Sequence, residues 1–367
     1  MRRPLGSRLR LRELHPVRLG TVRVTAEDRL RQLSLLPEPA RPALKILDQR
    51  DRGTRFIRLS VRSVLNSPAT TGMGFWSVNP YVGCEFGCTY CYARDTHRYT
   101  IERLGERKAG PAWLDFERRI LVKTEVAEVL AKTLDPARLG DASLVIGTAT
   151  DPYQPAERRF RLTRAVLELL LRYRGLSIGL ITKSPLVTRD LAVLQALSAR
   201  HEVSVNISLA TLDAKLARRL ELRSPVPAAR IRALRRLIEG GVHAGLLVAP
   251  IVPGITDDRA GLSRLMGAAK DAGARYVVGS ALRLGPAARH RFLPVLAGEF
   301  PELAERYRQH YERSESASPA YQAALKRRLH RLQRVHGFPV DEGMRRRQQL
   351  EGRRPRSAPA REQESLL

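Results

Sequence analysis

Apolar and polar positions alternate in blocks along the middle of the chain, and these blocks predict six strands separated by helices. Apolar runs of strand length lie at 75–82, 143–150, 177–183, 202–210, 243–250 and 274–282. Apolar residues at helical spacing lie between them, at 158–173, 187–197, 213–220, 228–239 and 257–272. Parallel strands that are buried on both faces and joined by helices produce this repeat. The pattern therefore predicts an α/β fold, either an open sheet or an incomplete barrel. In both, functional groups lie at the carboxyl ends of the strands.

The two ends of the chain depart from this pattern. The first part is Arg-rich and interrupted by prolines, which predicts a basic, poorly ordered extension. After the last strand, 293–313 and 319–336 are helical by periodicity and rich in Lys and Arg. The final residues have almost no apolar side chains, so we predict a disordered Arg-rich tail. The predicted segments are an N-terminal extension over 1–55, a core domain over 56–290, basic C-terminal helices over 291–340 and the tail over 341–367.

Composition adds a strong positive charge to this picture. The net charge is +28, and a basic surface favours encounters with polyanions such as nucleic acid. The alternative is that Arg is simply the usual surface cation here. No apolar run of eighteen residues is present, which predicts no membrane span. The basic N-terminus lacks the apolar region of a signal peptide. We therefore expect a cytoplasmic protein.

The candidate chemistry lies in Cys84, Cys88 and Cys91, the only cysteines among 367 residues. An odd number of thiols within eight positions favours metal ligation over disulfides. Three thiolates can hold three corners of a cubane iron–sulfur cluster and leave one iron open for chemistry. The alternative is a zinc site with His97 as fourth ligand, in a basic nucleic-acid-binding protein without catalysis. Free thiols at a metal fit a reducing compartment.

The spacing C-x3-C-x2-C, with Tyr90 just before the last cysteine, resembles the signature of the radical S-adenosylmethionine (SAM) superfamily. The stretch WSVNPYVGCEFGCTYCYARDTH is similar to its spore photoproduct lyase-like branch. Over roughly residues 56–285, the resemblance implies a partial (βα)6 barrel of TIM type. It also implies a [4Fe-4S] cluster on the three cysteines, with SAM on the open iron. An electron from a donor such as flavodoxin or ferredoxin would cleave SAM to a 5'-deoxyadenosyl radical that acts on an unknown substrate.

The same resemblance assigns polar residues at two strand ends to SAM. Thr148, Thr150 and Asp151 follow the second strand, where the family binds the amino group of SAM; an ordinary helix entry is the alternative. Lys183 ends the third strand, where a lysine is costly to desolvate unless it meets an anion. The SAM carboxylate is that anion by resemblance, and a lysine snorkelling at the rim is the alternative.

Later segments extend these assignments. By this resemblance, Ser208 is the first candidate and Asn206 the second candidate for the family's contact to the ribose or carboxylate. The alternative is that the polar side of this strand is simply a solvated face. The segment from Glu221 resembles a family stretch of Glu, Pro and Arg. From this segment Arg230 could reach the SAM carboxylate or lie at the surface. Residues 249–257 are similar to the family's adenine-edge loop, and Tyr90 is expected to pack on the adenine.

The absence of further cysteines in this chain narrows the chemistry. It excludes a second cysteine-bound cluster and methyl transfer through a methylated cysteine. The hydrogen relay of spore photoproduct lyase uses a cysteine at the end of the second strand, where this chain has Thr148 or Thr150. A hydroxyl O–H bond is too strong to donate a hydrogen atom there. The same relay is therefore not expected, and Tyr153 and Tyr276 are the candidate substitutes.

Overall fold

A computed structural model describes residues 46–49, 53–103 and 112–340. The tail predicted over 341–367 lies outside these residues, as does most of the extension predicted over 1–55. The described residues belong to one compact unit. Within them, no helix is both long and apolar enough to cross a membrane.

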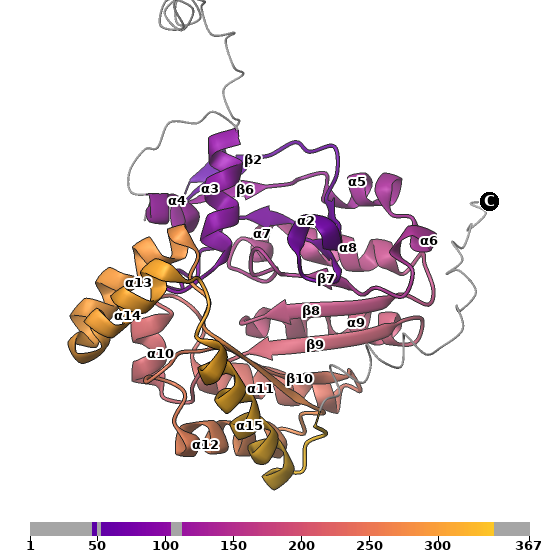
Figure 1. Cartoon of the computed structure of the whole chain (residues 1–367). Coiled ribbons are helices and arrows are strands. Elements are labelled where there is room, and N and C mark those ends of the chain that lie inside the picture. The colour runs from indigo at the N-terminus through magenta and orange to yellow at the C-terminus, as the bar shows by residue number, and fades with distance from the viewer. Residues whose placement is uncertain (1–45, 50–52, 104–111, 341–367) are drawn as a thin grey trace, which may run out of the picture. The chain divides into compact units, whose positions relative to one another are not determined.

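A seven-stranded sheet forms the centre of this unit (Figure 1). Its strands, in spatial order, are β11 (Val277–Ala281), β10 (Ala244–Ile251), β9 (Glu202–Ser208), β8 (Ser177–Thr182), β7 (Leu144–Ile146), β4 (Trp76–Val78) and β3 (Leu65–Asn66). Only β3 is antiparallel to its neighbour. The six parallel strands follow chain order without the reversal that a doubly wound sheet requires. The predicted partial (βα)6 barrel is confirmed, and the doubly wound alternative is not.

Helices follow the parallel strands and cover the sheet (Figure 1). They are α7 (Glu157–Phe160) and α8 (Leu162–Leu170) after β7, η1 (Pro185–Asp190) and α9 (Leu191–Ser198) after β8, α10 (Ala214–Leu220) and α11 (Pro227–Glu239) after β9, and α12 (Arg259–Asp271) after β10. Their apolar faces join the strands in one core; α8, for example, buries Val166, Leu167 and Leu170. Side chains cap the starts of η1, α10 and α12. Asp213, for instance, accepts hydrogen bonds from two backbone N–H groups of α10.

A second, four-stranded sheet lies at the start of the described residues. Its order is β1 (Ile46–Gln49), β2 (Arg55–Arg58), β6 (Arg119–Val122) and β5 (Tyr81–Val82). The prediction of a single strand over 75–82 is wrong, because β4 and β5 belong to different sheets. The break falls at Asn79 and Pro80. Proline has no N–H to pair, and the Asn79 side chain instead accepts a hydrogen bond from the Ala149 N–H at 2.8 Å. The chain thus changes sheets immediately before the cysteines.

Five further helices of the described residues lie between β3 and β7, and the last two of them connect the four-stranded sheet to the seven-stranded one. They are α2 (Pro68–Thr71), α3 (Ala93–Arg103), α4 (Ala112–Arg118), α5 (Val126–Thr133) and α6 (Pro136–Leu139). The C-terminal helices are α13 (Pro286–Glu299), α14 (Pro301–Arg313) and α15 (Pro319–Val335). The prediction of one helix over 293–313 is wrong. Phe300 leaves the helical conformation and Pro301 starts a new helix, a position that proline favours.

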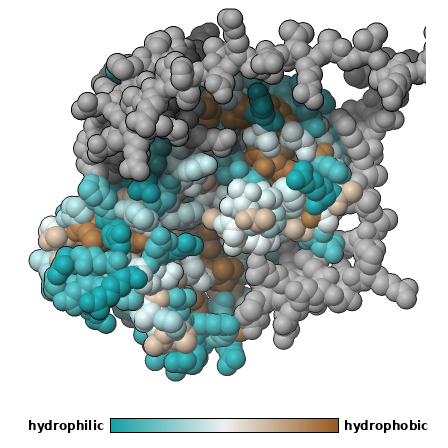
Figure 2. Space-filling view, turned by 45° about the horizontal axis from the view of Figure 1, so that its top comes forward, coloured by the Kyte–Doolittle hydropathy of each residue, from teal (hydrophilic) through white to brown (hydrophobic). Residues whose placement is uncertain are grey.

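The C-terminal helices contribute to a second hydrophobic core. Phe292, Tyr307 and Tyr311 from these helices pack in one cluster with Phe86 of the cysteine loop. On the visible face, patches of hydrophobic residues lie between broad hydrophilic areas (Figure 2). The division between core and C-terminal helices at residue 290 stays a prediction from composition, and the second core shows that these helices help to enclose the cysteine loop.

Candidate active site

A cavity of about 450 Å³ lies at the carboxyl ends of the parallel strands. The structure brings most of the predicted residues together around it, although they come from four separate strand ends. The predicted residues that line the cavity are Cys84, Cys88, Cys91, Tyr90, Thr148, Thr150, Asp151, Lys183 and Ser208. Ala249 and Pro250, from the segment likened to an adenine-edge loop, line it as well. A cavity of this size is in the range of small-molecule sites.

The cysteine loop is held in place by backbone hydrogen bonds to distant segments. The Cys84 N–H donates to the Phe116 carbonyl at 2.9 Å, and the Thr89 N–H donates to the Leu220 carbonyl at 2.9 Å. Gly83 has φ of +91°, and a Cβ there would lie 2.9 Å from the Phe116 carbonyl. Only glycine fits such a position without strain. These hydrogen bonds and Gly83 therefore set the shape of the cysteine loop.

The three thiols are suited to a cluster. Burial raises the pKa of each one, so a metal that binds them must displace their protons. Among the described residues, no group of three or more His, Cys, Asp and Glu side chains is arranged to hold a single metal ion. A cubane differs, because each cysteine binds a different iron and the thiols stand further apart.

His97, the fourth ligand of the zinc alternative, does not join the cysteines. It is buried, its Nε2 lies 3.1 Å from the Arg119 carbonyl, and its ring packs edge-on against Phe116. Burial lowers its pKa to about 4. His97 is also not among the residues that line the cavity. The zinc alternative is not favoured.

The Lys183 side chain is only 13% exposed and is paired, which excludes the snorkelling alternative. Its ammonium donates to the Ser208 hydroxyl at 2.8 Å and lies 3.3 Å from the Glu221 carboxylate. Burial alone would lower the pKa of Lys183, but the Glu221 carboxylate outweighs it and the pKa is raised. An ammonium has three donors. The contacts to Ser208 and Glu221 use two of them, and the third is available to a ligand in the cavity.

Glu221 is the centre of this network. It accepts hydrogen bonds from the Tyr90 hydroxyl, the Ser224 hydroxyl at 2.8 Å and the Arg230 guanidinium. Burial would raise its pKa, but Lys183 and then Arg230 lower it well below its usual range. Glu221 is thus ionised and fixes both Tyr90 and Lys183 at the cavity wall. We define Tyr90, Lys183, Glu221 and Arg230 as the cavity network.

Arg230 corrects one prediction. It lies neither at the surface nor in the cavity. It is fully buried, and it donates to the carbonyls of Pro225 and Ser208 at 2.8 and 3.0 Å as well as to Glu221. Its place is therefore behind the cavity wall, which it holds in position.

The predicted residues at the second strand end also form hydrogen bonds to neighbouring segments of the protein. The Asp151 carboxylate accepts hydrogen bonds from the Lys183 N–H at 2.7 Å and the Thr182 hydroxyl at 2.6 Å, which joins β7 to β8. Burial raises the pKa of Asp151, and these hydrogen bonds oppose the rise. The Thr150 hydroxyl donates to the Gly83 carbonyl at 2.6 Å, so it supports the cysteine loop. Thr148 accepts a hydrogen bond from the Asn79 side chain at 3.1 Å.

Three other predicted residues do not line the cavity. Asn206 donates to the Leu180 carbonyl at 3.3 Å and accepts from the Tyr276 hydroxyl at 3.1 Å, so these two residues bind each other. The Tyr153 hydroxyl donates to Asp190 at 3.0 Å. Neither Tyr153 nor Tyr276 is therefore placed as a substitute for the missing cysteine.

Some cavity residues were missed by sequence reasoning. Gly147 has φ of +98°, and a Cβ there would lie 2.4 Å from the Ile181 carbonyl, so only glycine lets β7 approach β8 at this end. Ala317 comes from the segment just before α15, and Gln322 from the first turn of α15. A glycine after an apolar strand was a usable signal for Gly147. No periodicity points from α15 to the cavity.

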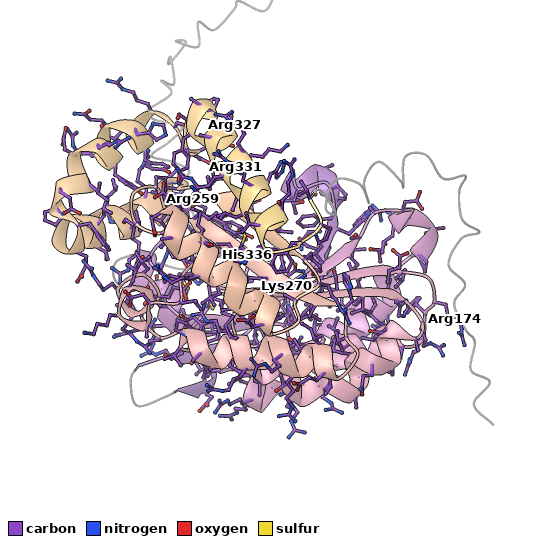
Figure 3. All side chains as sticks on the ribbon, turned by 90° about the horizontal axis from the view of Figure 1, so that it is seen from below. Arg174, Arg259, Lys270, Arg327, Arg331 and His336 are labelled. Carbon is purple, nitrogen blue, oxygen red and sulfur yellow. The ribbon has the colours of Figure 1, made fainter. Side chains whose placement is uncertain are left out.

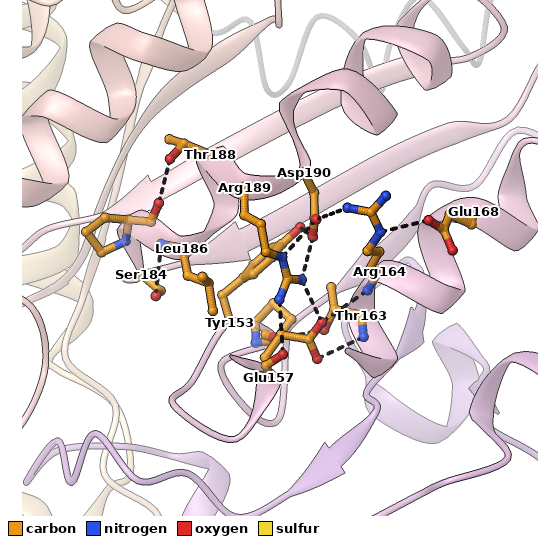
Figure 4. A network of polar contacts seen from close by, with 12 residues as sticks. Tyr153, Glu157, Thr163, Arg164, Glu168, Ser184, Leu186, Thr188, Arg189 and Asp190 are labelled. Carbon is orange, nitrogen blue, oxygen red and sulfur yellow. Dashed lines mark hydrogen bonds and ion pairs between the residues drawn. The ribbon is translucent and has the colours of Figure 1, made fainter. Parts of the chain in front are cut away.

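A second, largely buried network joins the segments after β7 and β8 (Figure 4). Arg189 bridges the carboxylates of Glu157 and Asp190 at 3.1 and 2.7 Å, and both carboxylates are fully buried. The Tyr153 hydroxyl donates to Asp190, and the Tyr81 hydroxyl donates to Glu157 at 2.5 Å. We define these five residues as the closed network, because none of them lines the cavity.

Comparison with known proteins agrees with this geometry. A family model described as the radical SAM superfamily matches residues 78–265. An uncharacterized protein of Mycobacterium tuberculosis is 34% identical over 279 residues, which cover 76% of this chain and 79% of that protein. An uncharacterized protein of Methanocaldococcus jannaschii is 27% identical over 201 residues, which cover 55% of this chain and 69% of that protein.

The fold is also shared with a solved enzyme. A mutant of spore photoproduct lyase matches with a TM-score of 0.53 at 14% identity, and the match covers 84% of this chain and 90% of that one. At this identity the likeness shows the fold alone. The assignment to a family rests instead on the family model and on the relatives. This chain belongs to the radical SAM superfamily and is an enzyme of radical chemistry that uses a [4Fe-4S] cluster and SAM.

Proposed function

We propose that Cys84, Cys88 and Cys91 ligate the [4Fe-4S] cluster and that SAM occupies the cavity beside it. The cluster supplies the electron that cleaves SAM reductively to a 5'-deoxyadenosyl radical. The observation that carries this proposal is that one cavity is lined by all three cysteines and by Asp151, Lys183 and Ser208. Thiols, a carboxylate and an ammonium are the groups needed for a cluster, an amino group and a carboxylate.

The residues of the cavity bind and orient the cofactor. The third donor of Lys183 binds the SAM carboxylate, and Glu221 keeps the ammonium charged and in position. The Asp151 carboxylate, which lines the cavity, attracts the amino group of SAM. Apolar side chains such as Leu247 and Ala249 enclose the adenosine and exclude water, which protects a reactive radical.

An anaerobic preparation tests this proposal. We expect a brown protein with about four irons per chain, which is the composition of the cluster. With dithionite and SAM it should release 5'-deoxyadenosine. A colourless protein with one zinc would contradict the proposal. A search for deuterium transferred into 5'-deoxyadenosine from labelled compounds would then identify the substrate.

We further propose that the substrate is a polyanion of the nucleic-acid class, and α15 supports this. The helix carries five Lys and Arg residues and no Asp or Glu. Its first turns border the cavity through Gln322, while Arg327 and Arg331 are exposed further along (Figure 3). Arg259 of the neighbouring α12 is exposed as well. A strand whose reacting part enters the cavity would meet these cations with its phosphates.

Charge reversal on α15 tests the nucleic-acid proposal. We expect the double variant Arg327→Glu with Arg331→Glu to weaken binding to RNA or duplex DNA and to flatten its log–log salt dependence by about two. The matched control is Arg232→Glu with Arg235→Glu, two exposed arginines of α11. Release of 5'-deoxyadenosine without substrate should stay unchanged. Equal effects of the two double variants, or no binding at about 50 mM salt, would contradict the nucleic-acid proposal alone.

A further inference from the structure

A second cavity, of about 680 Å³, shares a lining residue with the active-site cavity. Its lining comes from the loop after β10, from α14 and from the start of α15. Ala317 lines both cavities. Next to it in the chain, Ser316 lines the active-site cavity and Ser318 lines the second one. The two cavities therefore adjoin along the short segment between α14 and α15.

Two arginines of α14 line the second cavity without ion pairs. Arg306 and Arg313 are exposed, and neither forms an ion pair with a carboxylate of the described residues. The carboxylates of α14 pair instead with Arg308, which binds Glu305 and Glu312 at 2.6 and 3.1 Å and does not line the cavity. Arg306 and Arg313 are two helical turns apart, about 10 Å along the axis, so they lie on the same side of α14. Guanidinium groups in this state are suited to the phosphates of a ligand.

The second cavity also has an aromatic lining, formed by Tyr307, Tyr311 and Tyr321. The rings of Tyr307 and Tyr311 are buried and stack with their centroids 5.5 Å apart. Tyr321 is only half-buried, and its hydroxyl donates to the Asp257 carboxylate at 2.8 Å, which fixes the ring at the cavity wall. A fixed aromatic ring at a cavity offers a surface on which a base can stack.

Asp257 is the only carboxylate among the residues that line the second cavity in the described part of the chain. Both of its oxygens already accept hydrogen bonds, one from the Gly254 N–H at 2.8 Å and the other from the Tyr321 hydroxyl. One carboxylate with two partners stands against two arginines without ion pairs. The lining therefore favours an anionic ligand, and Asp257 serves to position Tyr321.

We propose that the second cavity binds the nucleotide next to the reacting one in a nucleic-acid strand, an inference that rests on the nucleic-acid substrate under Proposed function. Arg306 and Arg313 bind phosphates of the strand, and the Tyr321 ring stacks on the base. A nucleotide combines an anion with a planar aromatic group, and the lining offers a partner for each. Because the two cavities adjoin at Ala317, one strand can occupy both at once.

Fluorescence anisotropy with the full chain and a labelled single strand of about ten nucleotides, as DNA and as RNA, tests this role. At about 50 mM salt, Arg306→Gln and Arg313→Gln should each weaken binding about fivefold and flatten the log–log salt dependence by about 0.7, the contribution of one phosphate contact on a single strand. The matched control is Arg308→Gln, which removes the same charge from the same helix outside the cavity. Losses no larger than in this control would overturn the inference.

Two variants of Tyr321 test the stacking. Tyr321→Ala should weaken binding about tenfold, because the base loses its ring partner. Tyr321→Phe keeps the ring and should restore most of the lost affinity. Equal losses in Tyr321→Ala and Tyr321→Phe would speak against stacking and contradict the inference.

The parent protein separates this inference from the proposal on which it rests. If the parent binds neither oligonucleotide, the nucleic-acid proposal and this inference fail together. If the parent binds but the arginine variants match Arg308→Gln, only this inference fails. Adenosine monophosphate that binds as tightly as the oligonucleotide would indicate a site for a free nucleotide and would also overturn it. If Tyr321→Ala fails to fold, the exposed arginines of α14 still decide.

Discussion

The cavity network and the closed network are built from similar groups but have different surroundings. Both contain a largely buried cation, Lys183 or Arg189, next to buried carboxylates and tyrosines. In the cavity network, Lys183 lines the cavity and has one donor left for a ligand. In the closed network, Glu157 is satisfied on all sides by Tyr81, Thr163 and Arg189 and by the Arg164 N–H.

This difference shows how buried charge should be interpreted. A buried ion pair by itself is equally consistent with a role in stability or in function, because its partners satisfy it in both cases. What distinguishes the cavity network is a donor directed at space that a ligand can fill. The closed network instead joins the segment after β7 to the segment after β8, and these two segments carry Asp151 and Lys183. We expect mutations to separate the two networks into function and stability.

The largest effect on function is expected from the cysteines. Replacing Cys84, Cys88 or Cys91 by Ala should abolish the stable cluster and all SAM cleavage, because two thiolates leave two irons without protein ligands. Iron analysis after anaerobic reconstitution and release of 5'-deoxyadenosine measure both losses. Circular dichroism should show a folded chain. Full iron content in any of these variants would contradict the assignment.

The largest effect on stability is expected in the closed network. Glu157→Ala leaves Arg189 and two buried hydrogen-bond donors without their acceptor, so the free energy of unfolding should fall by about 3–5 kcal/mol. The SAM affinity of the folded protein should remain close to that of the parent. The matched control is Glu168→Ala, whose partner Arg164 is exposed, with an expected loss below about 1 kcal/mol. Urea denaturation measures both. Equal losses in Glu157→Ala and Glu168→Ala would contradict the structural importance of the closed network.

A smaller loss, in affinity rather than stability, is expected at Lys183. Lys183→Met removes the donor to the SAM carboxylate, so SAM binding should weaken by roughly 2–5 kcal/mol, the range for truncating a buried charge pair. The cluster spectrum should stay the same, since no thiol is touched. Lys215→Met, at an exposed lysine of α10, is the control. Unchanged SAM affinity in Lys183→Met would place Lys183 with the closed network, as a residue of structural importance only.

The smallest effect concerns pH and His97. Its pKa is lowered to about 4 by burial, whereas an unfolded chain has the ordinary value near 6.5. The unfolded state therefore binds more protons between these values, and the folded state loses stability as the pH falls from 6.5 to 4. The loss should reach roughly 2–3 kcal/mol at pH 4.

His97→Gln should remove this part of the pH dependence, as measured by denaturation at pH 7 and pH 4. If His97 were instead a metal ligand, removing the metal from the parent protein with a chelator at pH 7 should lower the free energy of unfolding as acid does. An identical pH dependence in parent and variant would contradict a buried neutral His97.

Much of this protein was readable from local sequence. The six strands follow from short apolar runs, because a parallel strand must bury its side chains wherever it lies in the sheet. The number and spacing of the three cysteines indicate metal ligation, since metal ligands on one loop are fixed by the number of residues between them, and the resemblance of the surrounding stretch indicates the iron–sulfur cluster. Lys183 was identifiable because a lysine at the end of an apolar strand needs a negative partner.

Other features depended on the tertiary structure. The partner of Lys183 is Glu221, and Arg230 is buried behind the cavity, although nothing in the local pattern separates Arg230 from the exposed arginines of α11. Glu117 meets Arg94 and Arg291 only because α3, α4 and α13 pack together. Periodicity records how each segment is buried, but the choice of partner depends on which distant segments the crossovers bring side by side. For this protein, the sequence determined the cofactor chemistry and the order of the strands, and the packing of distant helices decided which charges surround them.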